Sequence, residues 1–372
     1  MKKRFLSVAL AAAVAMSATA CTSNPAESKT TAAPAETKAE ETTAAEASSE
    51  GEKKQAAADG DLITVGYAQV GAESDWRTAN TESFKSTFTE ENGYKLIFDD
   101  AQQKQENQLT AIRNFIQQEV DYIVLAPVTE TGWDTVLQEA KDAGIPVIIV
   151  DRMVDVSDDS LYTAWVGSNF KLEGQKACEW LKQYAAAKNM SEVNIVDIQG
   201  TIGASAQIGR TEALNEAVEV NGWNLLAQQT GEFTQAKGQE VMESMLKQYD
   251  NINVVYCEND NEAFGAIEAI KAAGKTVGPD GDILVMSFDT TKQGITDTLS
   301  GDIIVNTECN PLHGPRVEQI IKQLQAGETP EKQAYVEEGI YAHGSDVASV
   351  SIDGTDYEVT EVTQDVVDAR AY

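Results

Sequence analysis

The sequence predicts an α/β protein made of two lobes with parallel sheets. From Leu62 onward, short apolar runs alternate with amphipathic stretches, a pattern typical of parallel strands connected by helices. Most of the runs are rich in Val and Ile, as strands buried on both faces require. Roughly 310 residues follow the N-terminal region, more than a single hydrophobic core usually accommodates, which predicts two lobes.

The strands and helices are expected in alternation along the chain. The predicted strands are 63–70, 95–98, 122–126, 147–150, 163–166, 194–198, 224–228, 253–256, 283–288 and 303–306. The predicted helices are 105–117, 133–143, 172–186, 209–220, 236–249, 262–273 and 315–324. In the first of these helices, Leu109, Ile112 and Phe115 fall on one face, which would pack on a sheet. Gly144 and Gly274 follow two of the helices as termination signals.

The first twenty residues predict a secretory signal peptide. Lys2, Lys3 and Arg4 are followed by an apolar stretch over 5–16 and by small residues before Cys21. The segment resembles a bacterial lipobox, which implies that Cys21 is acylated and anchors the mature protein to the outer face of the cell membrane. It departs from the usual lipobox at Ala18, where Leu is common, and ordinary cleavage with an incidental Cys21 is the alternative.

Residues 21–60 are expected to form the lipid anchor and a disordered linker. Beyond Cys21 they are almost entirely Ala, Thr, Ser, Glu, Lys and Pro, with no aromatic side chain. Such a segment buries too little apolar surface to offset the entropy lost on ordering. A tether between a lipid and a folded domain fits this composition.

Composition excludes several classes of function. Sixty acidic residues against twenty-eight basic ones argue against a nucleic-acid partner, because phosphate binding needs a basic surface. Cys178, Cys257 and Cys309 are scattered without disulfide or metal-ligand spacing, so neither a metal nor a cofactor is expected. No later segment is apolar enough to be predicted as a membrane span.

Polar residues gather directly after the predicted strands. These residues are Glu73, Ser74, Asp151, Arg152, Asn169, Gln199, Glu258, Asn259, Asp260 and Asp289. In doubly wound sheets, ligands bind outside the carboxyl ends of the strands, so the pattern favours a binding site there. The alternative is that these residues form turns and helix N-caps.

Most of the chain after Leu62 resembles the periplasmic sugar-binding proteins of the ribose and galactose type, and in particular their galactofuranose-binding members. The matching stretches are VGYAQVGAESDWR (65–77), QQKQENQ (102–108), APVTETGW (126–133), IVDR (149–152), QGTIGAS (199–205), GEFT (231–234), KG (237–238) and EVMES (240–244). The resemblance implies two doubly wound parallel-sheet lobes joined by a three-segment hinge, with the ligand held between them. It places the N-terminal lobe at 61–166 plus 309–333 and the C-terminal lobe at 167–308 plus 334–372.

The chemistry of a sugar agrees with the matched residues. Buried hydroxyl groups need paired, charge-assisted hydrogen bonds, and the C–H faces of the ring need flat apolar surfaces. The resemblance places a first group of ligand-binding residues in the loop after the first strand, namely Glu73, Ser74, Asp75, Trp76 and Arg77. The remaining candidates are Asp151, Arg152, Arg210, Phe233, Asn259, Asp260, Asp289 and Glu308.

Three of these positions have a competing interpretation. Arg210 could pair with Glu212 or Glu216 on the surface, and the ligand arginine of ribose-type relatives falls two positions earlier, at Ile208. Phe233 could be a core residue beneath its loop. Asp289 is followed by Thr290 where relatives commonly have Gly, and the extra side chain would either narrow the cleft or contact the sugar.

The expected function is that of a lipoprotein that captures a monosaccharide, galactofuranose or a similar furanose or hexose, for the permease of an ABC importer. A monomer is expected. The alternative is a sensor that presents the sugar to a chemotaxis or sensor-kinase partner. A transcription regulator is disfavoured because the chain begins with a signal and an acidic tether. An enzyme is disfavoured because no nucleotide-binding glycine motif, nucleophile motif or metal cluster is present.

Overall fold

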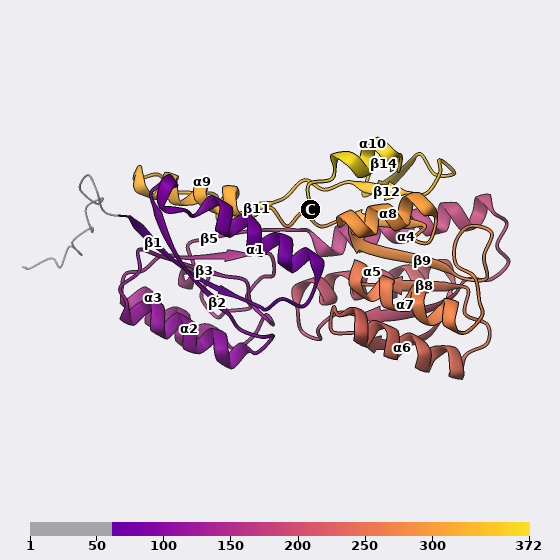
Figure 1. Ribbon diagram of the computed structural model, residues 1–372, viewed down its shortest axis with the longest axis horizontal. Helices are drawn as coiled ribbons and strands as arrows, with labels where there is room; N and C mark the ends of the chain where they lie inside the picture. The colour runs from indigo at the N-terminus through magenta and orange to yellow at the C-terminus, as the bar shows by residue number, and fades with distance from the viewer. Residues whose placement is uncertain (1–61) are drawn as a thin grey trace, which may run out of the picture. The chain divides into compact units, whose positions relative to one another are not determined.

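Two β-sheets, each covered by helices on both faces, form the two lobes of the protein (Figure 1). The computed structural model describes residues 62–372. The expected signal peptide (1–20), the acylation site Cys21 and the linker (21–60) lie outside the described residues. Within the part that is described, no helix is both long and apolar enough to cross a bilayer.

The first sheet is entirely parallel, with the strand order β11-β5-β4-β3-β1-β2. Its strands are β1 (Ile63–Gln69), β2 (Tyr94–Asp100), β3 (Tyr122–Leu125), β4 (Val147–Val150), β5 (Ala164–Gly167) and β11 (Gln333–Tyr335). The central strands β3 and β4 are almost wholly buried, which explains their uninterrupted apolar sequences.

Four helices cover the first sheet, two on each face (Figure 1). They are α1 (Asp75–Thr87), α2 (Gln105–Gln117), α3 (Asp134–Asp142) and α9 (Gly314–Gln325). Helices α2 and α3 pack on one face through Ile112 and Leu137, and α1 and α9 pack on the other through Phe84 and Ile321. Two short 3-10 helices complete this part of the chain, η1 (Glu90–Asn92) and η2 (Asp159–Leu161).

The second sheet is mixed, with the order β13-β14-β12-β10-β9-β8-β6-β7, and its pairs are parallel except for β10 with β12 and β13 with β14. Its strands are β6 (Asn194–Gln199), β7 (Asn224–Thr230), β8 (Val254–Cys257), β9 (Leu284–Asp289), β10 (Val305–Glu308), β12 (Ile340–Ala342), β13 (Ser349–Ile352) and β14 (Thr355–Glu361). Its helices are α4 (Phe170–Ala187), α5 (Ser205–Asn221), α6 (Gln235–Gln248), α7 (Asp260–Ala272), α8 (Lys292–Ser300) and α10 (Gln364–Ala369). One core cluster contains residues of α4 and α5, and another contains residues of α6 and α7.

The chain passes between the two lobes three times. The passages are 168–169 between β5 and α4, 309–313 between β10 and α9, and 336–339 between β11 and β12. The lobe boundaries given above stay a prediction, and the sheet pairing adds one detail to them. Strand β11 ends at Tyr335 and pairs with β5, so 334–335 belong to the first sheet and not to the second.

Three segments have structure that the sequence analysis did not predict. Helix α1 begins at Asp75, where a loop was expected, and helix α8 and the C-terminal strands had no predicted counterpart. The cause is clear in α1, which buries Arg77, Asn80, Thr81 and Ser83 and therefore lacks the apolar periodicity that reveals a helix. Strand β10 lies two residues later than expected, at Val305–Glu308.

Candidate functional site

One cavity between the two lobes gathers most of the side chains named from the sequence. Ten of them line it: Glu73, Ser74, Trp76, Arg77, Asp151, Arg152, Arg210, Phe233, Asn259 and Asp289. Its empty space is about 290 Å³, part of which is open to solvent. Because the lining comes from the ends of β1, β4, β8 and β9 and from helices next to them, the cavity lies where ligands bind in doubly wound sheets.

The first turn of α1 supplies the charged wall on the side of the first lobe. Ser74 caps the helix by accepting a hydrogen bond from the backbone N–H of Arg77. Arg77 Nε then donates to Glu73 Oε1 at 2.9 Å, and Arg77 Nη2 donates to Asp151 Oδ2 at 2.7 Å. The helix start thus fixes one guanidinium between two carboxylates, all three buried.

Arg152 completes this wall from the residue after Asp151. Its Nη1 donates to the carbonyl oxygen of Val128 at 2.9 Å, and its Nη2 lies 3.7 Å from Glu73 Oε1. Burial, together with the nearby Arg77, lowers the pKa of Arg152 from its ordinary value. Burial by itself would raise the pKa of Asp151, but the charges of Arg77 and Arg152 outweigh it, so the pKa is lowered and Asp151 is a carboxylate.

Arg210 forms the charged wall on the side of the second lobe. Its Nε donates to Glu173 Oε2 at 2.8 Å, its Nη1 donates to the carbonyl oxygen of Glu258, and its Nη2 lies 3.5 Å from Asp289 Oδ1. The side chain is almost fully buried, so the surface pairing considered for it does not occur. Lys171 makes that pairing instead, with Glu212 and Glu216.

Asn259 and Asp289 reach the cavity from the ends of β8 and β9. Asn259 caps α7, because its Oδ1 accepts the N–H of Glu262 at 2.8 Å. Asp289 has a φ of 101°, and Thr290 after it has a φ of 54°, a backbone region that favours glycine. The side chain of Thr290 does not line the cavity. Burial raises the pKa of Asp289 well above its ordinary value despite the opposing charge of Arg210.

Aromatic and small apolar side chains form the rest of the lining. Trp76, Phe170, Ala206, Phe233 and Cys309 belong to one buried cluster that brings together both lobes and a passage between them. The indole N–H of Trp76 donates to the carbonyl oxygen of Cys309 at 2.7 Å. The cavity therefore offers flat apolar surfaces beside its charged groups.

Two polar atoms at the cavity have no hydrogen-bond partner among residues 62–372. They are Glu73 Oε2 and Arg77 Nη1, one acceptor and one donor, both on buried side chains. Buried polar groups are nearly always paired, so atoms left without a partner at a cavity are suited to bind a ligand. The lining also contains three arginines and three carboxyl groups, which provide donors and acceptors for a ligand rich in hydroxyl groups.

The structure places Asp75, Asp260 and Glu308 outside the cavity lining. Asp75 is exposed on α1. The carboxylate of Asp260 accepts bonds from Ser287, Thr291 and Asn306 and so ties α7 to the loop before α8. The carboxylate of Glu308 accepts bonds from Arg370, Tyr372 and the N–H of Gly339, so it holds the C-terminus.

Three lining residues were not among the predicted ones: Phe170, Ala206 and Cys309. Phe170 is the first residue of α4 and follows its N-cap, Asn169. The sequence offered only Asn169, a polar residue after a predicted strand, as a sign that this part of the chain lies near the site. Ala206 and Cys309 carry no polar signal, and only the packing of the two lobes brings them to the cavity.

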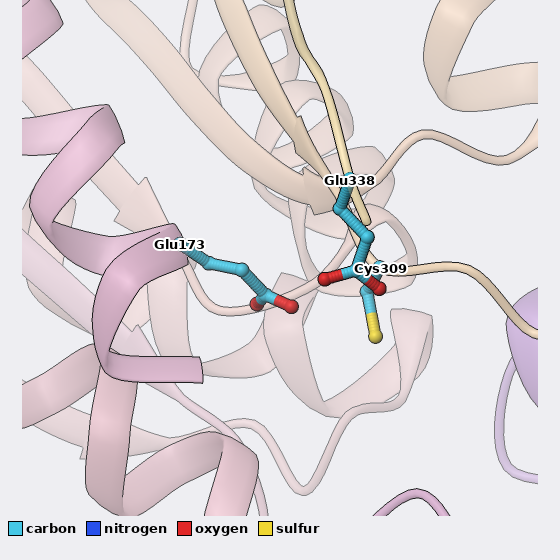
Figure 2. Close-up of side chains that lie close together, drawn as sticks. All are labelled: Glu173, Cys309 and Glu338. Carbon is cyan, nitrogen blue, oxygen red and sulfur yellow. The ribbon is translucent and has the colours of Figure 1, made fainter. Parts of the chain in front are cut away.

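A further cluster of Glu173, Cys309 and Glu338 lies beside the cavity, with ligand-type atoms within 4.8 Å of one another (Figure 2). One oxygen of each carboxyl group is engaged, since Glu173 Oε2 is bound by Arg210 and Glu338 Oε1 accepts from Ser168 and the N–H of Asn310. Burial raises the pKa of Glu173 and that of Glu338, and it raises the pKa of the Cys309 thiol well above its usual range. A raised pKa opposes the deprotonated form that a metal ligand needs, and we assign no metal to this cluster.

Comparison with known proteins agrees with this architecture. Residues 65–307 match the family described as the periplasmic binding protein domain. The chain is 42% identical over 285 residues to the galactofuranose-binding protein YtfQ of Escherichia coli, covering 75% of this chain and 87% of that protein.

Two solved structures extend the comparison. A protein of Mycobacterium smegmatis in complex with β-D-fucofuranose is 44% identical, with a TM-score of 0.72 over 76% of this chain and 91% of that one. The binding component of an arabinose ABC transporter of Shewanella sp. ANA-3, bound to α- and β-L-arabinofuranose, is 41% identical, with a TM-score of 0.70 over 75% and 91%.

Proposed function

We propose that this chain, which belongs to the periplasmic binding protein family, captures a monosaccharide in its furanose form. The relatives are solute-binding proteins, and the chain is a sugar-binding protein of an ABC importer. The finer proposal concerns the ring form of the ligand and the residues that hold it. We propose binding without a chemical step on the sugar.

The cavity between the lobes carries this proposal. Its three arginines, three carboxyl groups and Asn259 offer both donors and acceptors, and Trp76 and Phe233 offer flat apolar surfaces. A sugar buried there would pair its hydroxyl groups with these charged groups, and this pairing avoids the penalty of about 1–3 kcal/mol for each unpaired buried polar group. The lining from both lobes supports a closed form stabilised by the ligand.

The ring form rests on what the similar proteins bind. One is named for galactofuranose, one holds fucofuranose and one holds arabinofuranose. These sugars differ in their exocyclic groups and share a five-membered ring. We propose that the five-membered ring is what this cavity selects, with galactofuranose as the first candidate.

The remaining parts of the proposal concern the location and the partners. We propose that residues 1–20 direct export, that Cys21 is acylated and that 21–60 tether a monomer near the permease at the outer face of the membrane. The composition of these segments supports this. Presentation to a sensor-kinase or chemotaxis partner is the alternative, and a gene neighbourhood with permease and ATPase genes would favour import.

Calorimetric titration of the purified protein tests the ring form. D-Galactose, D-fucose and L-arabinose first establish sugar binding, because each contains some furanose at equilibrium. Two isomers, 1,4-anhydro-D-galactitol with a five-membered ring and 1,5-anhydro-D-galactitol with a six-membered ring, then separate the ring forms. We expect the first isomer to bind more tightly. Tighter binding of the second would overturn the furanose proposal, and binding of no sugar would overturn sugar capture in this cavity.

A further inference from the structure

Phe233 stands in the cavity wall in a backbone conformation that a phenylalanine rarely adopts. Its φ is 60°, and Glu232 before it has a φ of 57°. A non-glycine residue in this region costs of the order of 1–2 kcal/mol and persists only where its surroundings hold it. The contacts that hold Phe233 therefore contribute to the shape of the cavity.

The first turn of α7 binds both backbone groups of Phe233. Glu262 Oε1 accepts the N–H of Phe233 at 2.8 Å, and Asn259 Nδ2 donates to its carbonyl oxygen at 3.2 Å. Asn259 is the N-cap of α7, and Glu262 is the third residue of the helix. In a capping box, a glutamate at that position bonds back to the N-cap of its own helix. Here the carboxyl group is directed instead to a different loop.

Two glycines leave the room that this arrangement needs. A Cβ on Gly200 would lie 1.9 Å from the ring of Phe233, and a Cβ on Gly231 would lie 2.7 Å from Glu262 Oε1. Any side chain at Gly200 would push the ring away from its place. The ring in that place lies under the guanidinium of Arg152, whose Cζ is 5.2 Å from the ring centroid. Phe233 thus joins the second lobe to the charged wall of the first.

Packing does not explain why a carboxyl group is buried at Glu262. The residue is fully buried, and its Oε2 has no hydrogen-bond partner among residues 62–372. Burying an acidic group is costly, so a residue of this kind is explained by the bond that its other oxygen makes. That bond is the one to the N–H of Phe233.

We propose that Glu262 is a positioning residue of the sugar site, which acts on the ligand through Phe233 and does not touch it. The inference rests on the proposed function, because it assumes that the ring of Phe233 contacts the sugar. Glu262 and Gly200 together fix the ring over the cavity, where it covers a C–H face of the ligand and contacts Arg152.

A double-mutant cycle between Glu262 and Phe233 tests this proposal. Dissociation constants for D-galactose, D-fucose and L-arabinose are measured by calorimetry on wild type, Glu262→Ala, Phe233→Ala and the double variant, at a temperature where circular dichroism shows each folded. We expect Phe233→Ala and Glu262→Ala each to weaken binding about tenfold, the scale of one lost aromatic contact. In the Phe233→Ala background, we expect Glu262→Ala to add less than about twofold.

Matched variants separate positioning from a merely structural role. Glu262→Gln keeps an oxygen acceptor for the N–H of Phe233, so it should restore most of the affinity. Glu268→Ala removes an exposed glutamate from the same helix and should change nothing. If Glu262→Ala does not fold, Gly200→Ala displaces the ring from the other side, and its loss of affinity should also vanish in the Phe233→Ala background.

Equal losses in both backgrounds, or wild-type affinity in folded Glu262→Ala, would overturn the positioning role. If the wild-type protein bound none of the three sugars, the proposed function would be overturned instead. The two failures are therefore distinguishable.

Discussion

Arg77 Nη2 lies 2.7 Å from Asp151 Oδ2, and this bond joins the first turn of α1 to the residue that follows β4. Both side chains are buried at the cavity. Asp151 has a φ of 62°, a backbone conformation that is costly for a residue other than glycine. Its carboxylate accepts the bond from Arg77 in this conformation. The pair sets the positions of the charged groups on the first lobe's side of the site.

Replacement of Arg77 by Ala should strongly reduce both sugar binding and stability. It would leave the carboxylates of Glu73 and Asp151 buried without their guanidinium, and breaking a buried ion pair costs about 3–5 kcal/mol. We expect at least about a hundredfold weaker binding by calorimetry and a lower unfolding free energy in urea. Arg113→Ala is the matched control, because Arg113 pairs with Glu139 on the surface, where a pair contributes about 1 kcal/mol or less. Similar effects of the two substitutions would contradict this role for Arg77.

Arg210, and not the residue two positions earlier, should supply the guanidinium of the second lobe. Arg210 is buried at the cavity, whereas Ile208 is 40% exposed. We expect Arg210→Ala to abolish measurable sugar binding, since Glu173 and Asp289 would lose their buried cation. Ile208→Ala and Lys171→Ala should bind as wild type does. Normal affinity in Arg210→Ala would contradict a role of this residue in sugar binding.

His313 should make the protein less stable as the pH falls below about 6.5. Burial lowers the pKa of His313 to about 4, and Arg316 and Arg77 act in the same direction against Asp151. Between its ordinary pKa of about 6.5 and about 4, the unfolded chain binds the proton and the folded protein does not. The unfolding free energy should therefore drop across this window, by roughly 3 kcal/mol at most from this group.

Urea unfolding of wild type and His313→Gln at several pH values checks this expectation. The variant should lose part of the decline between pH 6.5 and pH 4. An identical decline in both proteins would show that His313 does not contribute to it.

Asp197 should make the protein less stable as the pH rises, the opposite of the effect of His313. It is fully buried in β6, and burial raises its pKa to about 7, against a hydrogen bond from Gln228. The folded protein then holds a proton that the unfolded chain loses above about pH 4, so stability should fall as the pH rises from about 4 to about 7. Asp197→Asn should gain stability relative to wild type at pH 8 and gain least at pH 4. A difference that does not change with pH would contradict this account.

The sequence revealed β1 to β10 because buried parallel strands have short Val- and Ile-rich sequences, as in β4. It did not reveal α1, because the buried face of this helix is largely polar: Arg77 lines the cavity, and Asn80 and Thr81 hydrogen-bond to Gln69 of β1. Polar residues after strands predicted Asp151, Asn259 and Asp289 at the cavity. The same signal also selected Asp260, whose carboxylate is used within the second lobe, because spacing does not show which way a side chain points.

The offset between Arg210 and Ile208 shows a second limit of sequence reasoning. In a helix of 3.6 residues per turn, side chains two residues apart lie about 200° apart around the axis. A shift of two residues therefore moves a side chain to the opposite face of the helix. In the structure Arg210 lines the cavity and Ile208 does not. The face is set by the packing of α5 against α4, which is so close that a Cβ added to Gly174 would lie 3.2 Å from the Cα of Arg210. Cys309 was missed for a related reason, since its place depends on the passage between the lobes.

A crystal structure of the protein with D-galactose would test the central claim most directly. We predict a five-membered ring in the cavity between the lobes, with hydroxyl groups bound to Glu73 Oε2 and Arg77 Nη1 and a C–H face against Phe233. A six-membered ring in that cavity, or a sugar bound away from these residues, would contradict the account.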